Sequence, residues 1–139
     1  MQLPAVTVLV ALPAVLALGG CIAKTPPHSD TLTGAVNTDV AVTADETGCH
    51  LDRGAATTGN VTFHVTNSGS RVTEFYVYTT DNRVMDEVEN IAPGQSRQLI
   101  VAVTEPGTYH VSCRPGMTGT AIRTDFTVTA AALGDSPKT

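Results

Sequence analysis

The sequence Val61-Thr62-Phe63-His64-Val65-Thr66 alternates between apolar and polar side chains without a break. Successive side chains of a β-strand point to opposite faces, so Val61, Phe63 and Val65 are predicted to face a core. His64 then faces outward, and we interpret it as a polar surface residue rather than as a ligand. This stretch therefore predicts a β-strand that is buried on one face.

Runs of similar composition recur along the chain from residue 40 onward. They are rich in Val, Thr, Phe and Tyr, and clusters of Gly, Pro, Asn and Asp separate them. Such runs favour strands and such clusters favour turns, whereas no window keeps the apolar spacing of a helix. We predict an all-β sandwich of about seven strands, at residues 40–44, 60–66, 73–79, 84–88, 96–103, 107–113 and 122–129.

The beginning of the chain predicts export. Residues 1–20 carry no charged side chain and are dominated by Val, Leu and Ala, which is typical of a signal peptide, although no Lys or Arg precedes the apolar run. Pro4 and Pro13 interrupt the run and argue against a retained transmembrane anchor. The segment Leu18-Gly19-Gly20-Cys21 resembles the lipobox of bacterial lipoproteins. Lipidation at Cys21 is therefore predicted to anchor the chain to the cell membrane, facing the extracytoplasmic side.

The rest of the chain divides into three parts. Residues 21–37 contain Thr, Pro, Ser and Asp without a hydrophobic period and are predicted to form a flexible tether, and residues 130–139 are predicted to form a disordered tail. Residues 38–129 are predicted to form one folded domain. A core of this size, built without Trp, favours a binding or carrier module over a catalytic scaffold. No Ser-His-Asp spacing, metal-hydrolase motif or phosphate loop appears, so we do not expect an enzyme.

The charge of the chain argues against one class of partner. The formal net charge is −5, and the eight Lys and Arg residues are scattered without a basic stripe. Nucleic acid is therefore not an expected partner.

Two cysteines remain once Cys21 is assigned to lipid. Cys49 follows the first predicted strand, and Cys113 ends the sixth. An even pair outside the cytoplasm favours a disulfide. The alternative is that both thiols bind a soft metal such as copper(I), because Met117 follows Cys113 in a turn. The residues alone leave both alternatives open.

Several separated segments, in order along the chain, are similar to one known family. The late strand that ends in Cys113, with Met117 four positions further on, looks like that of a cupredoxin. Five segments are similar to the cupredoxin-like domain of EfeO-type iron-uptake components, namely residues 61–67, 73–77, 87–94, 107–109 and 113–117. The resemblance implies a cupredoxin-like Greek-key β-sandwich. It also implies extracytoplasmic handling of iron or copper beside a ferrous-iron permease and a haem-dependent peroxidase.

In many members of this family an M75 peptidase-like domain follows the cupredoxin-like domain, whereas the present chain stops at Thr139. The resemblance therefore leaves two expectations. The partner domain is a separate M75 peptidase-like protein, or the chain is a stand-alone metal-binding lipoprotein.

The resemblance also implies a set of metal ligands. Cys113 and Met117 fall where a blue-copper protein has its Cys and Met, and Glu74 lies near the place of its first His. No His lies between Cys113 and Met117, so a blue-copper electron-transfer site is not expected. Cys49, Glu74, Cys113 and Met117 form a candidate copper site if both thiols are free. Glu74 precedes a largely apolar run, so we expect it to be partly buried with a metal or an Arg as its partner.

For a harder iron ion, the candidates are Glu87 and Glu89, which match acidic positions of the family. They share one face of a strand, with Asp86 on the other. The alternative is an edge strand whose charges prevent aggregation. His50, next to Cys49, is a further candidate, whereas His110 lies an odd number of residues before Cys113 and points to the opposite face.

Two functions follow. The first is a metal-binding lipoprotein, holding copper or iron, that is accessory to an EfeO-type iron-uptake system and has no catalysis of its own. The alternative is a non-metal interaction module that a structural Cys49–Cys113 disulfide stabilises.

Overall fold

The computed structural model describes residues 35–132 of the chain. The predicted signal peptide, the lipidation site Cys21, most of the predicted tether and most of the predicted tail lie outside the described residues. Between residues 35 and 132, no helix has the length and apolar character needed to span a bilayer.

The described residues form strands joined by short turns, with one short 3₁₀ turn, η1 (Pro115–Met117). The strands are β1 (Asn37–Asp45), β2 (Gly48–Leu51), β3 (Ala55–Thr57), β4 (Gly59–Asn67), β5 (Thr73–Tyr78), β6 (Val84–Ile91), β7 (Ser96–Val103), β8 (Gly107–Cys113) and β9 (Ile122–Thr129).

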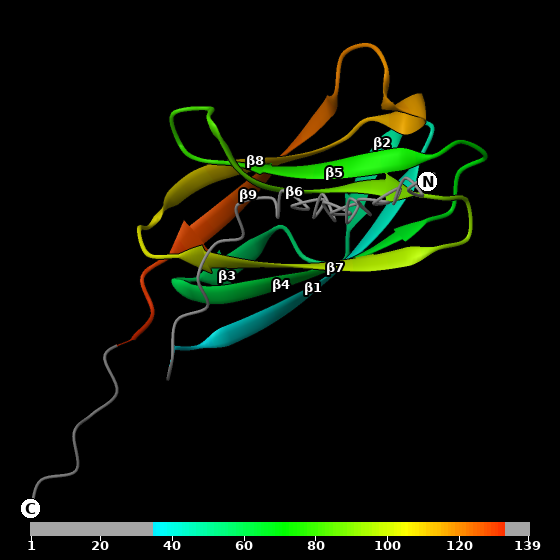
Figure 1. The fold of residues 1–139 in the computed structure, drawn as a ribbon. Coiled ribbons are helices and arrows are strands. Elements are labelled where there is room, and N and C mark those ends of the chain that lie inside the picture. Colours follow the sequence, from blue (N-terminus) through cyan, green and yellow to red (C-terminus); the bar gives the residue numbers. More distant parts are fainter. Residues whose placement is uncertain (1–34, 133–139) are drawn as a thin grey trace, which may run out of the picture.

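The strands build two sheets that pack face to face (Figure 1). One sheet has the order β2-β1-β4-β7, and the other has the order β3-β9-β8-β5-β6. β1 pairs in parallel with β4, and β3 pairs in parallel with β9, while the other neighbours are antiparallel. The predicted all-β sandwich is therefore confirmed.

The core lies between the sheets and follows the alternation that the sequence shows. Val61, Phe63 and Val65 of β4 are buried, whereas His64 is exposed on the outer face. The Phe63 ring lies 5.2 Å from the ring of Phe75 and 5.3 Å from that of Phe126, centroid to centroid. Because Phe75 and Phe126 belong to the other sheet, this aromatic cluster joins the two layers.

The observed strands differ from the prediction in number, and β1, β4, β5 and β6 have limits one to three residues away from the predicted ones. β7, β8 and β9 have the predicted limits, but β2 and β3 were not predicted. They contain four and three residues, which is too short for an alternating pattern to be recognised. β2 pairs with β1 after a tight turn, so its presence depends on its neighbour.

Candidate functional site

Cys49 of β2 and Cys113 of β8 form a disulfide, with their Cα atoms 5.4 Å apart. Both residues are buried, and the bond joins one sheet to the other. The structure thus contains the disulfide, one of the two alternatives that the sequence leaves open. In this state neither sulfur is a thiolate, so Cys49 and Cys113 offer no soft ligand.

Glu74 lies in β5, whose six residues are all buried. Phe75 and Val77 belong to the core, and Glu74 alternates with them onto the outer face of the sheet. The Glu74 side chain is only 1 % exposed. Its Oε1 accepts a hydrogen bond from Nε of Arg114 and forms an ion pair with Nη2 of the same guanidinium. A buried carboxylate requires a positive partner, and here that partner is a guanidinium.

Arg114 also contacts Tyr76, the next outward residue of β5. Its Nη2 donates a hydrogen bond of 2.9 Å to the Tyr76 hydroxyl, and its Cζ lies 5.5 Å from the centroid of the ring. Burial and the hydrogen bond with Glu74 raise the pKa of Tyr76. The hydrogen bond with Glu74 raises the pKa of Arg114 as well. The phenol and the guanidinium therefore keep their protons.

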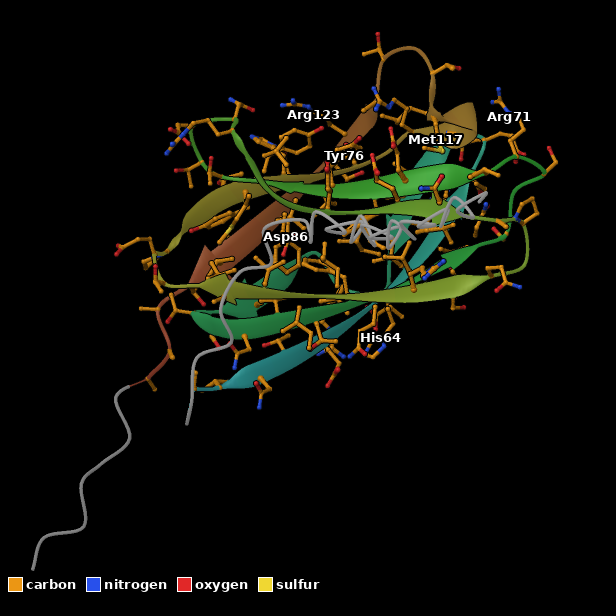
Figure 2. All side chains as sticks on the ribbon, in the orientation of Figure 1. His64, Arg71, Tyr76, Asp86, Met117 and Arg123 are labelled. Carbon is orange, nitrogen blue, oxygen red and sulfur yellow. A yellow bond between two sulfur atoms is a disulfide. The ribbon has the colours of Figure 1, made fainter. Side chains whose placement is uncertain are left out.

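A second arginine covers the next tyrosine of the same face. Tyr78 stacks on Tyr76 with 6.0 Å between the ring centroids, and Cζ of Arg123 lies 4.1 Å from the centroid of Tyr78. Arg123 also donates a hydrogen bond of 2.7 Å to Oδ1 of Asn82. We call Arg114, Tyr76, Tyr78 and Arg123 the arginine–tyrosine row. Figure 2 shows Tyr76 and Arg123 on the outer side of the five-stranded sheet, opposite to His64.

This row was not predicted from the sequence. Its signal is the period of two in Glu74-Phe75-Tyr76-Val77-Tyr78, which places Glu74 and both tyrosines on one face. The arginines could not be assigned in this way, because they come from other segments.

Met117 lies in η1, at the end of the sandwich where β8 ends. It is half-buried and has a φ of 55°. Its amide donates a hydrogen bond of 2.9 Å to the carbonyl of Arg114, and the amide of Gly116 donates one of 2.7 Å to the carbonyl of Val72. The turn that carries the candidate thioether is thus fixed to the backbone at the start of β5.

The acidic residues of β6 point in different directions. Glu87 is half-buried and pairs in register with Tyr76, whereas Glu89 is exposed. Asp86 is buried and pairs with the core residue Val77, and Figure 2 places it between the sheets. Burial raises the pKa of Glu87, and the charges of Glu89, Glu74 and Asp86 raise it further.

The histidines of the domain pair with carboxylates at the surface. His110 Nδ1 lies 2.9 Å from Asp125 Oδ1, and His64 Nε2 lies 2.8 Å from Asp39 Oδ1.

His50 Nε2 lies 3.1 Å from Asp45 Oδ2 and 2.9 Å from the Thr47 hydroxyl. Thr47 donates hydrogen bonds to Asp45 from its hydroxyl and its amide, and these lower the pKa of Asp45 to about 2. The imidazole that follows Cys49 is thus engaged with the turn between β1 and β2.

The donors present do not fit a copper ion. Residues 35–132 contain no group of three or more His, Cys, Asp or Glu side chains that could hold a metal. Cys113 is bonded to Cys49, and Glu74 is bonded to Arg114. The predicted ligand set was Cys49, Glu74, Cys113 and Met117. Of these four, only Met117 is neither in the disulfide nor in the ion pair with Arg114. A lone thioether is a weak metal ligand.

The sequence matches the cupredoxin-like domain family over residues 11–128. No functionally curated protein is significantly similar in sequence. Among solved structures, auracyanin B aligns with a TM-score of 0.52 and 14% identity, over 75% of this chain and 96% of its own.

Two further structures align with lower scores. Auracyanin from Roseiflexus castenholzii has a TM-score of 0.46 and 15% identity, over 69% of this chain and 99% of its own. A multicopper oxidase from Pediococcus acidilactici has a TM-score of 0.49 and 11% identity, over 89% of this chain and 31% of its own. At these identities the alignment with auracyanin B supports the fold alone.

Proposed function

Because the chain belongs to the cupredoxin-like domain family, we propose that it is an extracytoplasmic accessory module that binds another protein of a membrane metal-handling system. It has no copper centre and no catalysis of its own. The Cys49–Cys113 disulfide carries this proposal, since it occupies the cysteine that a copper site of this fold requires.

The system that best suits such a module is an EfeO-type iron-uptake system, because five segments of the sequence resemble the cupredoxin-like domain of EfeO-type components. A lipid on Cys21 would hold the domain at the membrane, where tethering raises its concentration beside a partner. The candidate partners are an iron permease, a haem peroxidase or a separate M75 peptidase-like protein.

A thiol count combined with metal titration tests this proposal. The material is the full chain carrying Cys21→Ser, which prevents lipidation and leaves only the other two cysteines. We expect no reactive thiol without reductant, and no heat of binding with copper(I) or copper(II) in calorimetry. Two reactive thiols together with binding of one copper ion per chain would contradict the proposal.

Iron binding at β6 is a second candidate function. Glu87 supports it. Burial raises its pKa most, and the charges of Glu89, Glu74 and Asp86 raise it further, so these carboxylates create a negative potential at Glu87 that attracts cations. The test is a ferric-iron titration of wild type and of a Glu87→Gln/Glu89→Gln variant. Glu105→Gln is a control that lies outside this strand. Iron binding lost only in the double variant supports this second function, and no iron binding in wild type excludes it.

A further inference from the structure

The sequence predicts Glu74 as a metal ligand, whereas in the structure its carboxylate is bonded to Arg114. We infer that the Arg114 guanidinium takes the place of a metal ion at Glu74 and thereby keeps this site closed to metals. The inference rests on the proposed function, in which the domain carries no copper.

The burial of the two partners supports this assignment. The Glu74 side chain is 1 % exposed and the Arg114 side chain is 33 % exposed, so solvent reaches Arg114 but not the carboxylate of Glu74. A cation that enters from the solvent therefore meets Arg114 first. The buried charge of Glu74 is already compensated, so a second cation would be repelled by the guanidinium and gain little from the carboxylate.

The backbone fixes Arg114 opposite Glu74. Cys113 pairs in register with Phe75, and the amide of Arg114 donates a hydrogen bond of 3.1 Å to the carbonyl of Glu74. The residue after Cys113 is thus delivered to Glu74 by the pairing of β8 with β5. The backbone pairing of β8 with β5 therefore sets the position of the guanidinium, and few side-chain rotamers need to be restricted to reach Glu74.

The guanidinium contacts two side chains with oxygen donors, and a third such side chain lies on the neighbouring strand β6. Besides the Glu74 carboxylate, Arg114 contacts the Tyr76 hydroxyl at 2.9 Å, and Glu87 pairs with Tyr76 across the sheet. Carboxylate and hydroxyl oxygens suit a hard ion such as manganese(II). Removal of the guanidinium alone leaves two carboxylates close to one phenol, with no positive charge from Arg114 between them.

The test is manganese(II) titration of the full chain carrying Cys21→Ser, with and without Arg114→Gln. We expect no detectable binding by the parent chain. The Arg114→Gln chain should bind at least about tenfold more tightly than the weakest binding that the titration detects. Glu74→Gln added to Arg114→Gln is expected to abolish the binding. Arg114→Lys, which keeps the charge, is expected to keep the site closed. Arg123→Gln is the matched control, because Arg123 covers Tyr78 and not Glu74.

Thermal unfolding provides a second readout, since a cation that binds only the folded state raises Tm. We expect manganese(II) to raise the Tm of the Arg114→Gln variant and to leave that of the parent unchanged. If the variant is unfolded, circular dichroism should show that manganese(II) refolds it. A folded variant that binds no better than the parent, or an unfolded one that the ion does not refold, overturns the inference.

The proposed function and this inference fail in different ways. Reactive thiols with copper binding in the parent chain refute the proposed function. A parent chain with closed thiols and no copper, combined with an Arg114→Gln variant that gains no manganese(II), refutes the inference alone.

Discussion

Glu74 and Arg114 form an ion pair whose two sides differ in access to water. The Glu74 carboxylate is buried on the outer side of β5, whereas a third of the Arg114 side chain remains exposed. A charge that can turn toward water tolerates the loss of its partner, and a charge that cannot must protonate or recruit another cation. The cost of breaking the pair therefore depends on which partner is removed.

We predict that Arg114→Gln destabilises the domain by about 3–5 kcal/mol, because it leaves a buried carboxylate uncompensated. Glu74→Gln should cost only about 1–2 kcal/mol, because Arg114 can reach solvent. Urea unfolding of both variants at neutral pH, without added metal, measures the difference. Equal losses, or a larger loss for Glu74→Gln, would show that the carboxylate is not buried as described.

At the turn between β1 and β2, Asp45 makes the free energy of unfolding depend on pH in the acid range. Its pKa lies at about 2 in the folded chain, below the ordinary value of 3.8, chiefly because the Thr47 hydroxyl donates to it. A depressed carboxyl pKa stabilises the folded state above pH 3.8, and this contribution is lost as the pH falls toward 2. We predict that Asp45→Asn is less stable than wild type at pH 6 and that the difference shrinks over this acid range.

Urea unfolding at a series of pH values measures this effect. Thr47→Val removes the hydroxyl donor and should reduce the pH-dependent difference without changing the carboxylate. If the difference in free energy of unfolding between wild type and Asp45→Asn stays constant from pH 6 to about pH 2, the hydrogen bonds of this turn do not lower the pKa of Asp45.

At the scale of the elements, the five-stranded sheet is covered on both faces along β5. Core residues of the other sheet cover the inner face, and the arginine–tyrosine row covers much of the outer face. The disulfide adds a covalent link from the centre of this sheet to β2, the edge strand of the other. β8 is thus held by backbone pairing on two sides and by a bond across the core.

We predict that replacing the disulfide with Cys49→Ala/Cys113→Ala costs about 4 kcal/mol, because the bond closes a loop of 64 residues in the unfolded chain. Urea unfolding with and without dithiothreitol measures this cost. Reductant should destabilise the wild-type domain and leave the double variant unchanged. Equal sensitivity of both proteins would mean that the reductant acts elsewhere.

At the scale of the whole molecule, the two sheets pack against each other through a small apolar core. It contains no Trp, and Phe63 of one sheet contacts Phe75 and Phe126 of the other. Three aromatic rings therefore contribute much of the buried area between the layers. Because so few rings join the two sheets, the loss of one ring should weaken the packing between the sheets and lower the free energy of unfolding.

We predict that Phe63→Ala destabilises the domain by about 3–5 kcal/mol. Ile100→Ala in the adjacent strand β7 is the matched control, because Ile100 is 37 % exposed and should cost less than about 1 kcal/mol. Thermal and urea unfolding of both variants provide the comparison. A large loss for Ile100→Ala would show that the outer face of the four-stranded sheet is covered.

The sequence by itself determined the two-layer β fold, because a period of two in side-chain polarity is a local property of each strand. It fixed which residues of β4 face the core and the limits of β7, β8 and β9, but not β2 or β3, whose few residues carry no period. It also indicated that Glu74 needs a metal or an arginine, and that Cys49 and Cys113 are disulfide-bonded or ligands. Only the tertiary structure chose among these partners. Arg114 lies 40 residues from Glu74 and Cys113 lies 64 from Cys49, and contacts over such separations depend on strand register and sheet packing, which no local pattern encodes.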